Sequence, residues 1–196
     1  MKRALSLPVA LLALSAAGCG TFYAEGEIPE VCITLPALTV PITAVSGVSG
    51  TFTREVNFGL SNAIPDFVLK GSSGDRSLRL LRLELTVPSG QAAGANLDWL
   101  DAAELRVVPP PGSSLPSRTL VQYAQGPSSL PITQVTVQPT GETNLADYIG
   151  QDQLSLFMSG NVSFPAGLPA SENLMVKGCF YARVHETLQQ IIDASK

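Results

Sequence analysis

Short segments in which apolar and polar residues alternate run through most of this 196-residue chain, and proline or glycine ends many of them. Residues 77–90, SLRLLRLELTVPSG, are the clearest example, with Leu81, Leu83, Leu85 and Val87 on one face. A period of two residues is that of a half-buried β-strand, whereas an amphipathic helix repeats every 3.6 residues. The pattern therefore predicts a chain built from short strands, each burying one face.

One irregularity lies inside that segment. Leu78 and Leu80 are out of phase with the apolar residues that follow them. A β-bulge inserts one extra residue into a strand and so reverses the face that its side chains take. We therefore predict a bulge near Leu80 and Leu81.

Other strand-like segments cover much of the chain. They are residues 31–35, 38–45, 50–60, 66–75, 118–124, 132–140, 153–165 and 172–184, with a turn and a strand over 96–108. Because 15 prolines and 17 glycines interrupt the chain often, the sequence predicts an all-β fold, an antiparallel β-sandwich of about eight to nine strands. Because few helices separate the strands, parallel β-α-β units are not expected.

Two short helical elements are also expected. Residues 143–152, TNLADYIGQD, predict a helical turn capped by Thr143 or Asn144. Residues 185–196 carry apolar side chains at helical spacing, which predicts a short C-terminal helix.

The N-terminus has the features of an export signal. Met1-Lys2-Arg3 is basic, residues 4–17 are mainly apolar, and small residues follow. The apolar stretch is shorter than the roughly 20 residues that cross a bilayer, and its arrangement is that of a secretory signal peptide. Ala16-Ala17-Gly18-Cys19 resembles the lipobox of bacterial lipoproteins, in which signal peptidase II cuts before the cysteine and lipid is attached to its sulfur.

This resemblance implies a signal peptide over residues 1–18, a lipidated tether over 19–30 and a single β-sandwich domain over 31–196. In that family an aspartate after the cysteine commonly marks retention in the inner membrane. Residue 20 is glycine, so the resemblance implies the outer membrane. The alternative is an ordinary signal peptide cut nearby, with Cys19 lost or left free.

A second resemblance concerns the domain itself. The order of turn, helix and strand in LDWLDAAELRVV and NLADYIGQDQLSL loosely resembles that of the immunoglobulin-like sandwiches of bacterial surface lipoproteins. It implies an immunoglobulin-like arrangement of strands and assigns no role to any residue.

The charge of the chain limits its partners. The net charge is −4, and cleavage of the signal would remove Lys2 and Arg3 and lower it to −6. Nucleic-acid-binding surfaces and polybasic membrane-binding faces both require clustered lysine and arginine. We therefore expect no nucleic-acid partner, and we expect contact with a membrane through acyl chains on Cys19, because two or more such chains anchor stably.

Cys32 and Cys179 remain as an even pair once Cys19 carries lipid. Disulfides persist in oxidising compartments such as the bacterial periplasm. One cysteine lies in the first predicted strand and the other in the last, each on the more polar face, so we predict a cross-strand disulfide outside the core. The chain-entropy model assigns such a bridge about 5 kcal/mol. Two free buried thiols are the alternative.

Catalytic and metal-binding patterns are sparse. His185 is the only histidine, and the motifs G-x-S-x-G, S-x-x-K and H-E-x-x-H are absent from the sequence. We therefore predict no catalytic residue, no metal site and no cofactor. Asp98, Asp101 and Glu104 could hold Ca²⁺, and residues 71–75, GSSGD, could cradle an anion. A solvated polar edge and a plain hairpin turn are the simpler interpretations.

Three function classes follow. The first is a non-enzymatic envelope lipoprotein, a membrane-tethered binding or assembly module for an unknown envelope protein or polymer. The second is a carrier or receptor for an apolar ligand, which requires an unfilled pocket lined by Leu, Val or Phe. The third is a hydrolase that uses two carboxylates, which in glycoside chemistry lie roughly 5 to 9.5 Å apart.

Overall fold

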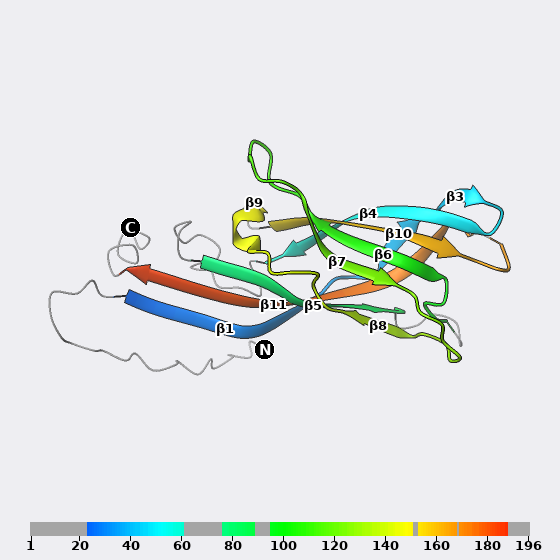
Figure 1. Cartoon of the computed structure of the whole chain (residues 1–196), viewed down its shortest axis with the longest axis horizontal. Coiled ribbons are helices and arrows are strands. Elements are labelled where there is room, and N and C mark those ends of the chain that lie inside the picture. The colour runs from blue at the N-terminus through cyan, green and yellow to red at the C-terminus, as the bar shows by residue number, and fades with distance from the viewer. Residues whose placement is uncertain (1–22, 61–75, 89–94, 151–152, 168, 188–196) are drawn as a thin grey trace, which may run out of the picture.

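The computed structural model describes residues 23–60, 76–88, 95–150, 153–167 and 169–187, and the structural statements below concern these residues. They form eleven β-strands and one 3₁₀ helix. The strands make two antiparallel sheets that pack face to face (Figure 1). The predicted all-β, antiparallel sandwich is thereby confirmed.

The first sheet has the strand order β1-β11-β5-β8, and β2 also pairs with β11. Its strands are β1 (Tyr23–Thr34), β2 (Leu38–Pro41), β5 (Arg76–Thr86), β8 (Gln134–Val137) and β11 (Ser171–Thr187). β11 has 17 residues and is the central element of this sheet. At about 3.3 Å per residue, it extends over about 55 Å.

The second sheet has the order β3-β4-β10-β6-β7, and β9 also pairs with β10. Its strands are β3 (Thr43–Ser46), β4 (Ser49–Gly59), β6 (Leu100–Val107), β7 (Arg118–Ala124), β9 (Ile149–Gly150) and β10 (Gln153–Ser163). The segment predicted as one strand over 38–45 is therefore two strands, β2 and β3, which belong to different sheets. This split after Pro41 is one reason why the described strands outnumber the predicted eight to nine.

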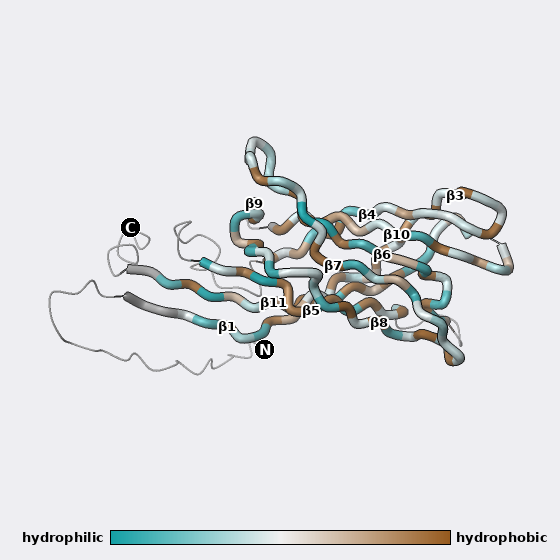
Figure 2. Tube along the Cα trace, in the orientation of Figure 1, coloured by the Kyte–Doolittle hydropathy of each residue, from teal (hydrophilic) through white to brown (hydrophobic). Residues whose placement is uncertain are grey.

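The core lies between the two sheets and consists of the apolar side chains that alternate inward along each strand. Figure 2 shows hydrophobic and hydrophilic residues alternating along the trace. Phe58 of the second sheet meets Phe180 of the first edge to face, with ring centroids 5.4 Å apart. Gly178 leaves room for this contact, because a Cβ there would lie 2.9 Å from the Phe180 ring. At one end of the core, Trp99 stacks on Phe164 at 5.7 Å.

The predicted bulge is present in β5. Cys179 of β11 is opposite Arg82, and the next residue, Phe180, is opposite Leu80, so that Leu81 is the extra residue. Leu78 and Leu80 are buried before the bulge, and other leucines of the strand are buried after it. Leu81 itself is only half-buried, because the bulge takes it out of the alternation.

The predicted helical turn is the 3₁₀ helix η1 (Leu145–Tyr148), and Asn144 is its N-cap. The Asn144 side chain accepts from the Ala146 amide at 3.2 Å and from the Leu78 amide at 3.0 Å, and it donates to the Arg76 carbonyl at 3.0 Å. One side chain therefore caps η1 and also fixes it against the start of β5. No helix among the described residues is long and apolar enough to cross a bilayer.

Two expectations about the chain ends are wrong. Residues 23–30, predicted as part of a tether, are strand, because β1 begins at Tyr23 and pairs with β11 from there. Residues 185–187, predicted as the start of a C-terminal helix, continue β11. The rest of that predicted helix, 188–196, lies outside the described residues.

The two chain-end segments that were predicted wrongly pair with each other. Tyr23–Ile28 of β1 pair with Ala182–Thr187 of β11, and we call this pair of segments the terminal arm. Figure 1 shows the terminal arm at the left, where it projects beyond the second sheet. Both the first residue of β1 and the last residue of β11 lie at its tip.

Candidate functional site

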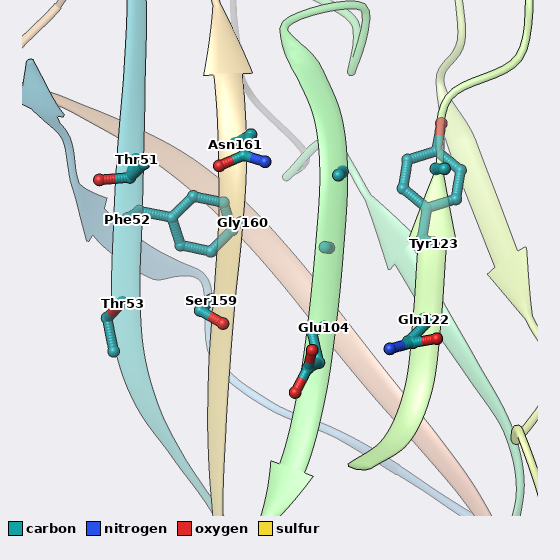
Figure 3. A pocket seen from close by; sticks show the side chains of 12 residues that line it. Thr51, Phe52, Thr53, Glu104, Gln122, Tyr123, Ser159, Gly160 and Asn161 are labelled. Atoms are coloured by element: carbon teal, nitrogen blue, oxygen red, sulfur yellow. The ribbon is translucent and has the colours of Figure 1, made fainter. Parts of the chain in front are cut away.

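The outer face of the second sheet carries a hollow of about 510 Å³, which we call the outer hollow. Four adjacent strands, β4, β10, β6 and β7, form it (Figure 3). Its lining residues are Thr51, Phe52, Thr53, Ala102, Ala103, Glu104, Gln122, Tyr123, Ala124, Ser159, Gly160 and Asn161.

Strand register places the outward side chains of the outer hollow in two rows. Each row crosses β4, β10, β6 and β7 in that order, because directly opposed residues of antiparallel strands share a face. One row is Thr51, Asn161, Ala102 and Ala124. The other row is Thr53, Ser159, Glu104 and Gln122. The rows combine hydroxyl and amide groups with two alanines and one carboxylate, that of Glu104, so the face is mainly polar and uncharged.

Gly160 lies between the two rows, at a position of β10 that is opposite the buried residues Phe52 and Ala103. A Cβ at this position would lie 2.4 Å from the Ala102 carbonyl oxygen and 2.5 Å from the Phe52 ring. The absence of a side chain lets the Phe52 ring lie across β10 (Figure 3). The floor of the outer hollow is therefore a bare stretch of backbone above a buried aromatic ring.

Most polar side chains of the outer hollow have unused hydrogen-bonding capacity. In the described part of the chain, Thr51, Thr53, Gln122, Ser159 and Asn161 make no side-chain hydrogen bond to another residue. Their hydroxyl and amide groups can each donate and accept. They therefore face solvent as a set of neutral groups available to a ligand.

Glu104 belongs to the outward rows, whereas Tyr123 is opposite Ala103 and borders the outer hollow from the core-facing side of β7. Glu104 accepts from the Thr119 hydroxyl at 2.9 Å and lies 3.4 Å from the Arg106 guanidinium, so its carboxylate already has partners. Burial, together with the negative charge of Asp98, raises the pKa of Tyr123 above its ordinary value of 10.0. The Tyr123 hydroxyl is therefore protonated at neutral pH and can donate a hydrogen bond.

The outer face of the first sheet has a different character, because its charges pair with one another. Arg82 contacts Glu30 at 2.6 Å and Glu84 at 2.8 Å, and Lys177 contacts Glu84 at 3.1 Å. The hydrogen bond from Arg82, followed by that from Lys177, lowers the pKa of Glu84. The hydrogen bond to Glu30 is the main reason why the pKa of Arg82 is raised. These four side chains form a closed network that ties β1, β5 and β11 together.

The disulfide lies beside this network. Cys32 and Cys179 are directly opposite in β1 and β11 and are bonded to each other, which confirms the predicted pairing. Cys32 is exposed and Cys179 is fully buried. Arg82 accounts for part of that burial, because it is opposite Cys179 in β5 and its guanidinium lies 3.8 Å from the Cys32 sulfur. The bridge is thus on the outer face, as predicted, but beneath charged side chains.

The disulfide also bears on metal binding. Glu30, Cys32 and Cys179 each bring one possible ligand atom to within 4.8 Å of the others. Metal ions bind the thiolate form of cysteine, and here both sulfurs are used by the bond between them. With the bridge formed, this cluster offers a metal ion the Glu30 carboxylate alone.

The acidic residues singled out in the sequence do not converge. Asp98 accepts from the Ile132 amide at 2.7 Å, and Asp101 accepts from the Ser163 hydroxyl at 2.5 Å. Of these acids, only Glu104 lines the outer hollow. The structure thus distributes the predicted cluster along β6 and the turn before it.

The sequence also singled out His185, Cys19 and residues 71–75. His185 is in the terminal arm, opposite Glu25, at the end of the molecule away from the outer hollow. Cys19 and the possible anion-binding turn, residues 71–75, lie outside the described residues.

Sequence reasoning did not find the outer hollow. Its residues come from four strands that are far apart along the chain, and their adjacency depends on the strand order. A weak signal was present, because the outward positions of residues 50–60 and 153–165 include several small, uncharged side chains. Small outward side chains indicate a flat sheet face, but they do not indicate which strands lie side by side.

Comparison with known proteins finds no matching family model and no matching curated protein. Among solved structures, the chain resembles the BFDV capsid protein in its decameric crystal structure, with 9% identity and a TM-score of 0.38, over 82% of this chain and 99% of that one. It resembles Desmodium yellow mottle tymovirus with 11% identity and a TM-score of 0.35, over 91% and 97%. For the empty head of Turnip yellow mosaic virus the values are 14% and 0.28, over 93% and 90%. At these TM-scores the resemblances carry no conclusion about function.

Proposed function

We propose that this protein is a non-catalytic lipoprotein of a bacterial cell envelope, anchored to the outer membrane through acyl chains on Cys19. Its role is to bind or assemble an envelope protein or polymer, with the outer hollow as its binding face. An acidic chain with few clustered basic residues is a poor ligand for nucleic acid, which supports a partner of another class.

The observation that carries this proposal is the position of the terminal arm relative to the outer hollow. Cys19 precedes Tyr23 by four residues, and four residues reach at most about 14 Å. Tyr23 is at the tip of the terminal arm, whereas the outer hollow includes the beginning of β4 and the end of β10 at the other end of the molecule (Figure 1). A lipid on Cys19 would leave that face accessible in the surrounding aqueous layer.

Exposed apolar side chains support the same orientation. Val45 and Val48 are 70% and 47% exposed at the hairpin between β3 and β4, and Leu130 is 75% exposed in the connection from β7 to β8. Both connections lie at the end of the molecule opposite the terminal arm (Figure 1). They give a partner at that end of the molecule apolar side chains to contact.

The test of the anchor is the variant Cys19→Ser in a Gram-negative bacterial host. We expect the wild-type protein to incorporate labelled palmitate and to fractionate with the outer membrane, because two or more acyl chains anchor stably. Cys19→Ser should incorporate no label and should leave the outer-membrane fraction. Cys32→Ser combined with Cys179→Ser is the control, since it removes the other two cysteines together and should still be labelled at Cys19. A Cys19→Ser protein that is labelled and fractionates as the wild type does would overturn the proposal.

A further inference from the structure

We infer that the outer hollow binds a neutral glycan, a segment of an uncharged polysaccharide or glycan chain. This inference rests on the proposed function and names the class of polymer that the face would take. It is carried by the chemistry of the lining, by the charges of its surroundings and by the use of the backbone groups beneath it.

The lining matches a ligand rich in hydroxyl groups. Thr51, Thr53, Ser159, Asn161 and Gln122 form two rows across four strands, and within the described chain their side chains make no hydrogen bonds to other residues. A sugar hydroxyl donates one hydrogen bond and accepts others, as do these hydroxyl groups, and an amide provides both functions as well. Neutral polar groups recur from strand to strand in each row, so they can bind successive sugar units.

Charged ligands fit the outer hollow poorly. Its lining contains no lysine or arginine, so an anion would find no opposite charge there. Its one carboxylate, Glu104, already accepts from Thr119 and faces Arg106. The first sheet shows the alternative arrangement, in which arginine, lysine and glutamate neutralise one another on the outer face.

An extended peptide also fits less well than a glycan. Peptides that add a strand to a sheet require an open strand edge with free backbone amides and carbonyls. The outer hollow is on the face of four strands that pair with one another, so the ladder uses much of the backbone beneath it. Recognition on this face must therefore come from side chains.

Two alanines leave room for a sugar ring on this face. Ala102 and Ala124 are opposite each other in the row that also contains Asn161, whereas Tyr123 is opposite Ala103 and shares its core-facing side. Binding sites for small polar ligands commonly have a few well-placed polar groups. A sugar ring can lie over the two alanines while its hydroxyl groups reach the threonine, serine and amide side chains.

The test measures binding of neutral oligosaccharides by the purified full-length protein in detergent. The probes are oligomers of glucose and of N-acetylglucosamine, observed by saturation-transfer NMR and titrated calorimetrically. We expect saturable binding of at least one probe. Ala102→Trp should weaken it at least about tenfold, because an outward indole fills the outer hollow. Thr53→Ala combined with Asn161→Ala should weaken it about tenfold, as expected for the loss of two hydrogen bonds.

Asn57→Trp is the matched control, because Asn57 is exposed on β4, one strand of the same sheet, but does not line the outer hollow. It should bind the probes as the wild type does. Saturable binding of neither probe, or equal binding by Ala102→Trp and the wild type, overturns the inference. A photo-cross-linker at Ser159 that captures a protein in cells, together with no probe binding, also overturns it but leaves the proposed function standing. A wild-type protein that incorporates no palmitate would contradict the proposed function alone.

Discussion

Gly160 lies where β4, β10 and β6 approach one another most closely. A Cβ there would meet the Ala102 carbonyl oxygen at 2.4 Å and the Phe52 ring at 2.5 Å, and the carbonyl belongs to backbone that cannot rotate away. We therefore expect Gly160→Ala to lower the free energy of unfolding by about 1–3 kcal/mol, as overpacked cores do. Urea unfolding of the purified protein measures the change.

The control for this substitution is Gly59→Ala at the end of β4, where a Cβ would meet no atom within 4 Å. It should change the free energy of unfolding by no more than about 0.5 kcal/mol. If the two alanine variants are equally stable, then the close approach of Phe52 and Ala102 to Gly160 does not limit the side chain at this position.

Single residues also show what the sequence could reveal. The bulge at Leu81 was predictable because two runs of alternating leucines are out of phase within one segment. The burial of Cys179 was not predictable in the same way. The residues that share its face of the strand, Lys177 and Tyr181, are polar, and it is covered in part by Arg82, which belongs to another strand. The alternation of apolar and polar residues is a property of one segment, whereas the burial of a side chain depends on which segments become neighbours in the fold.

Among the elements, β1 departs furthest from what its sequence predicts. Its first part, YAEGEIPE, has no alternation and contains glycine and proline, which disfavour strands. It is a strand because β11 is long enough to provide a pairing partner for all of it, with a register shift between Ile28 and Val31 around Pro29. A sheet edge tolerates proline, since one side of an edge strand needs no ladder hydrogen bonds. Tertiary pairing has therefore overridden local propensity.

The disulfide should matter most to β1, because β1 is an edge strand that pairs only with β11 among the described strands. The bridge joins residues 147 positions apart, and the chain-entropy model gives a loss of about 5 kcal/mol without it. We expect Cys32→Ala combined with Cys179→Ala to lower the melting temperature and to speed amide exchange in β1 more than in β4. Hydrogen exchange with mass spectrometry measures both strands. Unchanged protection of β1 in the double variant would show that strand pairing alone holds it.

At the scale of the whole molecule, the sequence indicated the architecture but not the binding face. Alternation in residues 50–60, 77–90 and 153–165 was enough to predict strands with one buried face each. The outer hollow required the order β4-β10-β6-β7, in which strands far apart in the chain lie side by side. Long-range pairing of this kind is determined by how both sheets pack together, and no single segment encodes it.

The position of the lipid anchor at one end of a long molecule leads to the last prediction. Trp99 is the only tryptophan, and it stacks on Phe164 beyond the end of β10, at the end of the molecule away from the terminal arm. In vesicles that contain dansyl-labelled phospholipid, energy transfer from Trp99 of the lipidated protein should be weak, because β11 alone extends over about 55 Å. Tyr23→Trp in a Trp99→Phe background should show strong transfer, since residue 23 follows Cys19 by four positions. Equal transfer from both positions would mean that the protein lies flat on the bilayer, and the outer hollow would then not be held away from the membrane.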